Sequence, residues 1–288
     1  MKYIVSFMLS GLFFCSSLIA QDNIIKEKVV DQVDVVSYEI EAVVASPSTR
    51  EFSIIESFKN DFSTSTWSKD IYRQIGKDTY GNDSFFLPIK TNERDVNLFT
   101  LLVDLMSANK TPIYKFNPQP ILDSENRLEG AEALKECAIP FTVNTDGTYA
   151  VKRSDIPSED ITYYLVKEKW HFDSKTSKGE ARVTHICPVL FERGKYFPLF
   201  WISMDDISAY LSRSETLVSF KNVLPALTNA SMSDIINNRY YRGCIYQVGL
   251  RQLSHHFTDM QELINERIRI ENELDYIQSR FYTAQNRR

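Results

Sequence analysis

The segment at 163–203 constrains the fold more than any other part of the chain. It reads YYLVKEKWHFDSKTSKGEARVTHICPVLFERGKYFPLFWIS. Runs of β-branched and aromatic residues are separated by two polar, glycine-containing turns at 174–179 and 193–194, which predicts three antiparallel strands joined as a meander. The sequence therefore predicts an α+β fold, in which a short antiparallel sheet with a three-stranded meander at about 161–203 packs with helices.

Alternation along the middle strand of this meander assigns its side chains to two faces. One face is predicted to carry Ala181, Val183, His185, Cys187 and Val189. The other is predicted to carry Arg182, Thr184 and Ile186.

Apolar residues at 3–4 spacing predict helices elsewhere in the chain. The segment TWSKDIYRQI at 66–75 is predicted to be a short helix, with Trp67, Ile71 and Gln74 on one face and Lys69 and Arg73 exposed. Further helices are predicted at 95–107, 128–137 and 204–211, the last with Ser203 at the capping position. Short strands are predicted at 85–87 and 113–116.

A long amphipathic helix is predicted at the C-terminal end. Thr258 and Gln261 have the spacing of a capping box. The predicted apolar face carries Met260, Ile264, Ile268, Leu274, Ile277 and Phe281. The predicted polar face carries Glu262, Glu266, Arg267, Glu271 and Glu273. Such a helix either docks on its own core or binds in the groove of a partner, and the sequence leaves both open.

The first sixty residues are predicted to lie outside the folded domain. Residues 1–20 have the charged start, apolar run and small residues of a cleaved signal peptide, with lipidation of Cys15 as the alternative. The run is too short to predict a membrane span. Residues 21–60 are predicted to be an N-terminal extension, extended or partly disordered, or a strand added to a neighbour's sheet. The α+β domain is predicted over 61–288.

Composition excludes several classes of protein. The net charge is −5 and the charges are interspersed, so the basic stripe of a nucleic-acid-binding protein is missing. Cys137, Cys187 and Cys244 remain after the leader, an odd number that permits at most one disulfide among them. These features predict an exported protein whose core is held by apolar burial.

No sequence motif for catalysis is present. The nine glycines form no phosphate-loop or dinucleotide pattern, and no G-x-S-x-G turn occurs. The carboxylate pairs Glu168 with Asp173 and Asp205 with Asp206 are interpreted as solvated caps. Aromatic residues are abundant, with 15 Tyr, 18 Phe and 3 Trp, and Tyr and Trp are favoured where proteins meet. We therefore expect no enzyme activity and no cofactor.

Two alternatives stay open. His185, Cys187, His255 and His256 are the residue types of a zinc site, which would make the chain an exported metal-dependent hydrolase. Exposed Tyr and Trp side chains would instead suit an autonomous module that binds surface glycans.

The order of motifs resembles one known family. TWSKDIYRQI, NLFTLLVDLMSANKTPIYKF, YLVKEKWHFDSKTSKGEARVTHICPV, PLFWI and RYYRGCIYQVGLRQL follow one another between about Trp67 and Phe257. This order is similar to that of the GldN/PorN family, and the W-x-F-D…R-V-x-x-I-C-P block is its most specific part. The residues that match the recurring motif are Trp67, Lys69, Arg73, Lys167, Trp170, Phe172, Asp173, Arg182, Pro188, Phe200 and Trp201.

The resemblance implies a non-enzymatic subunit of the type IX secretion and gliding machinery of Bacteroidota. It implies a place in the periplasm, held at the outer membrane through a partner. The implied partners are a GldK/PorK-like lipoprotein, the periplasmic part of a GldM/PorM-like motor component, and neighbouring copies in a ring. Most of the motif residues are expected to be structural, with some at an interface.

Overall fold

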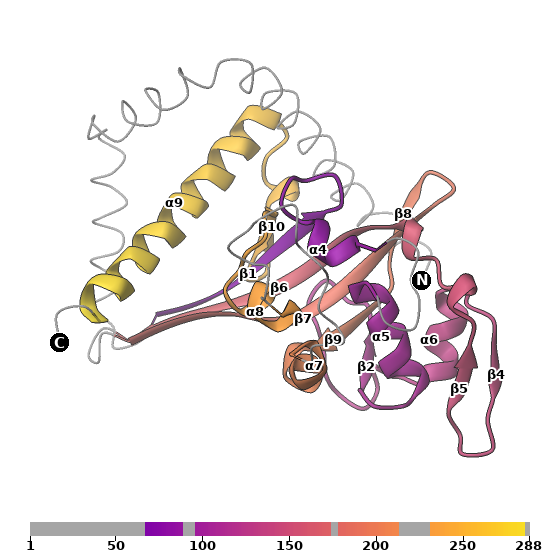
Figure 1. Cartoon of the computed structure of the whole chain (residues 1–288). Coiled ribbons are helices and arrows are strands. Elements are labelled where there is room, and N and C mark those ends of the chain that lie inside the picture. The colour runs from indigo at the N-terminus through magenta and orange to yellow at the C-terminus, as the bar shows by residue number, and fades with distance from the viewer. Residues whose placement is uncertain (1–66, 89–95, 174–177, 213–230, 286–288) are drawn as a thin grey trace.

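A nine-stranded antiparallel sheet forms the centre of the fold (Figure 1). The computed structural model describes residues 67–88, 96–173, 178–212 and 231–285. The predicted signal peptide at 1–20 and extension at 21–60 lie outside the described residues.

The strands of this sheet come from both halves of the chain. They are β1 (Trp67–Gly76), β2 (Ile113–Lys115), β3 (Arg127–Leu128), β6 (Ile161–Asp173), β7 (Lys178–Glu192), β8 (Lys195–Pro198), β9 (Phe200–Ser203), β10 (Cys244–Val248) and β11 (Arg251–Gln252). Their order is β11-β10-β1-β6-β7-β9-β2-β3, and β8 also pairs with β7. A separate hairpin, β4 (Phe141–Val143) with β5 (Tyr149–Val151), projects beside the main sheet (Figure 1).

The predicted meander is the centre of this sheet, but the sheet is much larger than three strands. β6 and β7 pair over twelve positions, and the third predicted strand is divided at Leu199 into β8 and β9, which both pair with β7. The α+β class is confirmed. The size of the sheet was underestimated, because its other strands are short or were assigned to other elements.

The predicted helix at 66–75 is wrong, since Trp67–Gly76 form the interior strand β1. β1 pairs with β6 along its whole length and with β10 on its other side. The spacing of Trp67, Ile71 and Gln74 fits a helix, but Ile71, Arg73 and Ile75 also alternate as a strand requires. Hydrogen bonding to β6 on one side and β10 on the other favours the strand.

Six α-helices are described. They are α4 (Asp83–Phe86), α5 (Leu98–Ser107), α6 (Gly130–Glu136), α7 (Met204–Leu211), α8 (Met232–Asn237) and α9 (Met260–Gln285). α5 begins at Leu98 because Asn97 accepts a hydrogen bond from the Thr100 amide at 2.9 Å. α7 has its predicted bounds, although the Ser203 side chain makes no capping bond. The predicted strand at 85–87 is wrong, because Phe85 and Phe86 belong to α4 and are buried.

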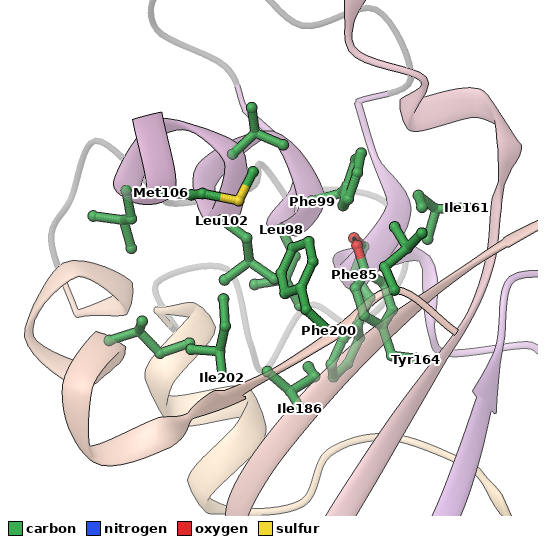
Figure 2. Close-up of a cluster of buried hydrophobic side chains, with 14 of the residues drawn as sticks. Phe85, Leu98, Phe99, Leu102, Met106, Ile161, Tyr164, Ile186, Phe200 and Ile202 are labelled. Carbon is green, nitrogen blue, oxygen red and sulfur yellow. Dashed lines mark hydrogen bonds between the residues drawn. The ribbon is translucent and has the colours of Figure 1, made fainter. Parts of the chain in front are cut away.

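One face of the sheet carries two apolar clusters side by side. α4, α5, α7 and α8 cover the first cluster, in which Phe85, Leu98 and Tyr164 meet (Figure 2). Of the α-helices that the structure describes, α9 is the one that lies at the other end of the sheet (Figure 1). It packs Leu263, Ile270, Leu274 and Ile277 against a second cluster that contains Trp67, Ile71, Trp170, Ile245 and Leu253.

The opposite face of the sheet is rich in aromatic residues. Its buried residues are Tyr72, Tyr163, Leu165, Cys187, Val189, Trp201 and Tyr246. The indole of Trp201 donates to the carbonyl of Asn117 at 2.9 Å, and the Gln119 amide donates to the carbonyl of Gly249 at 3.3 Å. Gln119 is four residues beyond β2, whereas Gly249 follows β10, five strands away. Strands β2 and β10 of a flat sheet would lie roughly 24 Å apart, so the segment that follows β2 reaches across this face toward the end of β10.

A β-bulge changes the predicted faces of the middle strand. Lys167 pairs with His185 and Glu168 pairs with Val183, so Thr184 is an extra residue on β7. Val183 therefore shares the first cluster with Ile186, whereas Cys187 and Val189 lie on the opposite face. The predicted alternation fails at this point because a strict period of two cannot continue through a bulge.

α9 docks on the chain's own sheet, and its buried face differs from the predicted one. Arg267 and Glu273 are buried, while Ile268 is 51% exposed. The helix is capped by Asp259, whose carboxylate accepts from the Glu262 amide at 3.0 Å, rather than by Thr258. The side chain of Phe281 lies outside the described residues. In the part of the chain that the structure describes, no helix has the length and apolar character needed to cross a membrane.

Candidate functional site: charged residues buried beneath the C-terminal helix

A fully buried carboxylate, Glu168, is the centre of a polar cluster between the two apolar clusters. It lies on β6, on the face that the helices cover. Its Oε1 accepts from the Nε of Arg73 at 2.9 Å and from the hydroxyl of Tyr241 at 2.7 Å. Its Oε2 accepts from the indole of Trp170 at 2.9 Å, and a guanidinium nitrogen of Arg239 lies 3.9 Å away.

The pairing keeps Glu168 ionised. Burial alone raises the pKa of a carboxyl, but the Arg73 and Arg239 guanidinium groups and the hydrogen bonds outweigh burial, so the pKa of Glu168 lies below its ordinary value. Burial and the Glu168 carboxylate together raise the pKa of Tyr241 well above 10. A carboxylate with a lowered pKa is a weak base at neutral pH, which is unsuited to general base catalysis.

Ion pairs connect this cluster to α9. The guanidinium of Arg73 donates to both carboxylate oxygens of Glu271, with Nη2 at 2.9 Å from Oε2. Lys69 pairs with Glu273, whose other oxygen lies 3.4 Å from Arg269. The sheet is therefore joined to the helix by charges as well as by apolar contacts.

Arg239 connects α8, β6 and α9. It follows the end of α8 with φ of 54°, a left-handed conformation that is unfavourable for a side chain other than glycine. Its guanidinium stacks on the indole of Trp170 at 4.2 Å from the ring centre, and it also donates to Gln278 of α9. These contacts offset the backbone cost of placing an arginine there.

A small open pocket remains between these residues. Its volume is about 160 Å³, and its lining residues are Arg73, Glu168, Trp170, Arg239, Tyr241, Glu271, Leu274 and Asp275. We call it the α8–α9 pocket.

The structure brings four of the motif residues together beneath α9. Trp67 and Trp170 are buried in the second cluster, and Lys69 and Arg73 make the ion pairs to the helix. The prediction that Lys69 and Arg73 are exposed is wrong, since Arg73 is 8% exposed and Lys69 is half-buried, because strand alternation points both toward α9.

The other motif residues are dispersed. Lys167 lies on the opposite face, 2.9 Å from Asp70, and Arg182 makes an exposed pair with Asp205 at 3.4 Å. Phe200 belongs to the first cluster and Trp201 to the aromatic face. Pro188 is buried on β7 opposite Tyr164. Phe172 and Asp173 end β6, and their side chains lie outside the described residues.

Sequence reasoning missed the central residues of the cluster. Glu168 was interpreted as a solvated cap paired with Asp173, and this is wrong because Glu168 is fully buried. The sequence did carry a signal of this burial, because strand alternation places Glu168 on the same face as Tyr164, Val166 and Trp170. A carboxylate at such a position requires a cation, but the sequence does not show that Arg73 and Arg239 supply it.

The residues of the zinc hypothesis do not converge. His185 lies on β7 with Nδ1 at 2.9 Å from the Thr184 hydroxyl, and Cys187 is fully buried on the aromatic face. His255 and His256 are exposed after β11. Within the described ranges, no group of three or more His, Cys, Asp or Glu side chains is placed to hold a metal ion.

The glycan hypothesis also loses part of its basis. All three tryptophans are buried, with exposed fractions of 6% or less. Tyr80 and Tyr240 are exposed.

Comparison with known proteins gives the family. No curated protein matches the chain. The family described as "Gliding motility associated protein GldN" matches residues 62–283, which include every strand that the structure describes and nearly all of α9. The chain therefore belongs to the GldN family and is a component of the gliding-motility and type IX secretion machinery.

Proposed function

We propose that the chain is a non-enzymatic structural subunit of a periplasmic ring complex of the type IX secretion and gliding machinery. In this proposal it binds a GldK/PorK-like lipoprotein of the outer membrane and the periplasmic part of a GldM/PorM-like motor component. The observation that carries the proposal is the family match over 62–283. The signal peptide predicted at 1–20 supports export to the periplasm.

The chemistry of the buried cluster supports a structural role. Arg73 and Glu168 are mutually paired and hydrogen-bonded, and such charges fix how elements pack. We propose that the motif residues Trp67, Lys69, Arg73 and Trp170 hold α9 on the sheet and leave its outer surface for partners.

Exposed apolar side chains provide area that partners can cover. Leu250, in the turn between β10 and β11, is 86% exposed, and Val143, in the projecting hairpin, is 65% exposed. In a ring, each copy presents two different surfaces to its neighbours, and the head-to-tail contact closes on itself.

Co-expression with the lipoprotein partner tests the proposal. We expect the chain alone to elute as a small species, and the two proteins together to elute as one assembly much larger than a one-to-one complex. Size-exclusion chromatography with light scattering measures both masses, and an unrelated outer-membrane lipoprotein is the control. Separate elution of the two proteins would contradict the proposal.

Metal analysis tests the hydrolase alternative independently. We expect purified protein to contain no stoichiometric metal. One zinc per chain, lost when His185 and His255 are replaced by alanine, would favour the hydrolase instead.

A further inference from the structure

The outer side of β7 is open at the start of the strand. Residues 178–183 pair with β6 on one side. On the other side, β9 pairs with β7 only at His185 and Ile186, and β8 pairs with it only from Val189 onward. Within the described ranges, no strand therefore covers the outer side of 178–183, which is a strand edge roughly 20 Å long.

The pairing register shows which backbone groups face this edge. The Gly249 amide donates to the carbonyl of Asp70 at 2.7 Å, so Asp70 faces β10 and the residue opposite it, Lys169, faces β7. Arg182 pairs with Lys169 and so faces β6. Because backbone groups alternate along a strand, those of Ala181 and of the residues two positions before and after it face outward. An edge of this kind is a template for pairing with a further strand.

The two faces beside the edge differ in character. Ala181 packs against the second cluster, which α9 covers. Figure 1 shows this end of β6 and β7 beneath the C-terminal part of α9, and α9 contacts β7. Arg182 lies on the other face, where half of its side chain is exposed beside Asp205. The sequence at 178–182, KGEAR, contains two cations and one carboxylate, so the edge carries a net positive charge.

The N-terminal extension contains a segment whose pattern complements both faces. Four apolar residues alternate with Ser37, Glu39 and Glu41 along this segment, namely Val36, Tyr38, Ile40 and Ala42. Such alternation is typical of a strand with one apolar and one acidic face. A strand added to β7 continues both faces of the sheet, so the apolar row would extend the second cluster next to Ala181. The acidic row would then lie beside the cationic edge, which is a favourable cross-strand arrangement.

The connection to the folded domain is long enough for this segment to reach another molecule. The chain enters the sheet at Trp67, which pairs with Phe172 at the same end as the open edge. Residues 43–66 lie between the segment and Trp67, and a connection of this length spans up to roughly 80 Å when it is extended.

We propose that residues 36–42 of one copy add as a strand to the open edge of β7 in a neighbouring copy. The proposal rests on the proposed function, because it specifies one contact between copies of the ring. The donated segment and the accepting edge are different parts of the chain, so the contact is head-to-tail and can close into a ring. A single short strand is a small contact, which agrees with a chain that elutes alone as a small species.

Photo-crosslinking between isotope-labelled copies tests the contact directly. A ¹⁵N-labelled chain with p-benzoylphenylalanine in place of Tyr38 is mixed at high concentration with an excess of unlabelled chain and irradiated. Mass spectrometry is expected to find the labelled segment joined to unlabelled peptides that contain Ala181. Crosslinks to labelled Ala181 peptides alone would mean that the segment occupies the edge of its own chain, and crosslinks elsewhere would mean that it does not occupy this edge. Either result would overturn the proposal.

Two matched proline variants assign the effect to the added strand. Ile40→Pro removes a backbone N–H from the centre of the segment and is expected to reduce crosslinking between copies about fivefold or more. Thr49→Pro makes the same change in the extension but outside the segment, and it is expected to leave crosslinking unchanged. Both positions precede β1, so the described core keeps its sequence. Equal crosslinking by the two variants would contradict strand addition.

Co-expression with the lipoprotein partner separates this proposal from the proposed function. Ile40→Pro is expected to reduce the mass of the assembly severalfold, whereas Thr49→Pro is expected to leave it unchanged. If both variants give the full assembly, the strand contact is wrong while the proposed function stands. If no assembly forms even with the unmodified chain, the proposed function fails, and the crosslinking alone decides whether copies exchange this strand.

Discussion

The Nε of Arg73 lies 2.9 Å from Oε1 of Glu168, and both side chains are buried, at 9% and 1% exposed. The two residues are diagonal neighbours on one face of the sheet, because Arg73 is paired in register with Val166. β1 and β6 therefore present opposite charges to the same point under α9. The main effect of such a pair on stability appears when one partner is removed, because the other charge then stays buried without compensation.

Replacing Glu168 with Gln is expected to destabilise the protein by about 3–5 kcal/mol, because the buried Arg73 would lose one of its two carboxylate partners and keep only the more exposed Glu271. Urea unfolding followed by circular dichroism measures this loss. Arg182→Gln, which breaks the exposed pair with Asp205, is the control and is expected to cost less than about 1 kcal/mol. Similar losses in the two variants would show that Glu168 is not the centre of the cluster.

The two sides of α9 are expected to respond differently to truncation. Leu274→Ala removes a side chain that is 1% exposed and is expected to cost about 2–5 kcal/mol. Ile268→Ala changes a side chain that is 51% exposed and is expected to cost less than about 0.5 kcal/mol. Urea unfolding compares them, and a larger loss at Ile268 would mean that the helix docks on its other face.

Stability is expected to fall between pH 7 and pH 5 because of His185. Burial, followed by the nearby charge of Lys167, lowers the pKa of His185 to about 4, whereas the unfolded residue titrates near 6.5. Between these values the unfolded state binds more protons, so stability decreases as the pH falls. The expected loss at pH 5 is about 1–2 kcal/mol.

The variant His185→Gln isolates this effect. It cannot titrate in this range, so its free energy of unfolding is expected to change less between pH 7 and pH 5 than that of the unmodified chain. Urea unfolding at both pH values gives the comparison. Equal slopes in the two proteins would assign the pH dependence to other groups.

Cys137 and Cys187 are expected to be unreactive in the folded protein. Both thiols are free and fully buried. Burial raises the pKa of Cys137 to about 12 and also raises that of Cys187, so neither forms the reactive thiolate at pH 8. Peptide mapping after iodoacetamide treatment is expected to find both unlabelled in buffer and labelled in urea. Rapid labelling in buffer would indicate that these parts of the core open readily.

The sequence determined the local architecture where the pattern had a single solution. The meander at 161–203 was found because its long strands alternate and its turns contain glycine. The helices predicted at 95–107 and 204–211 were found because their apolar spacing is helical; the first begins at Leu98, and the second has its predicted bounds although Ser203 makes no capping bond. The order of motifs was also sufficient to identify the GldN family.

Only the tertiary structure decided the elements whose local pattern was ambiguous. Trp67–Gly76 is a strand because β6 and β10 satisfy its backbone on both sides. The bulge at Thr184 moves Cys187 to the aromatic face, and no local signal marks it. The burial of Glu168 depends on Arg73, 95 residues away in the sequence. A buried charge is stable only when its counter-charge is adjacent in space, and which residue becomes adjacent is fixed by how the strands pair.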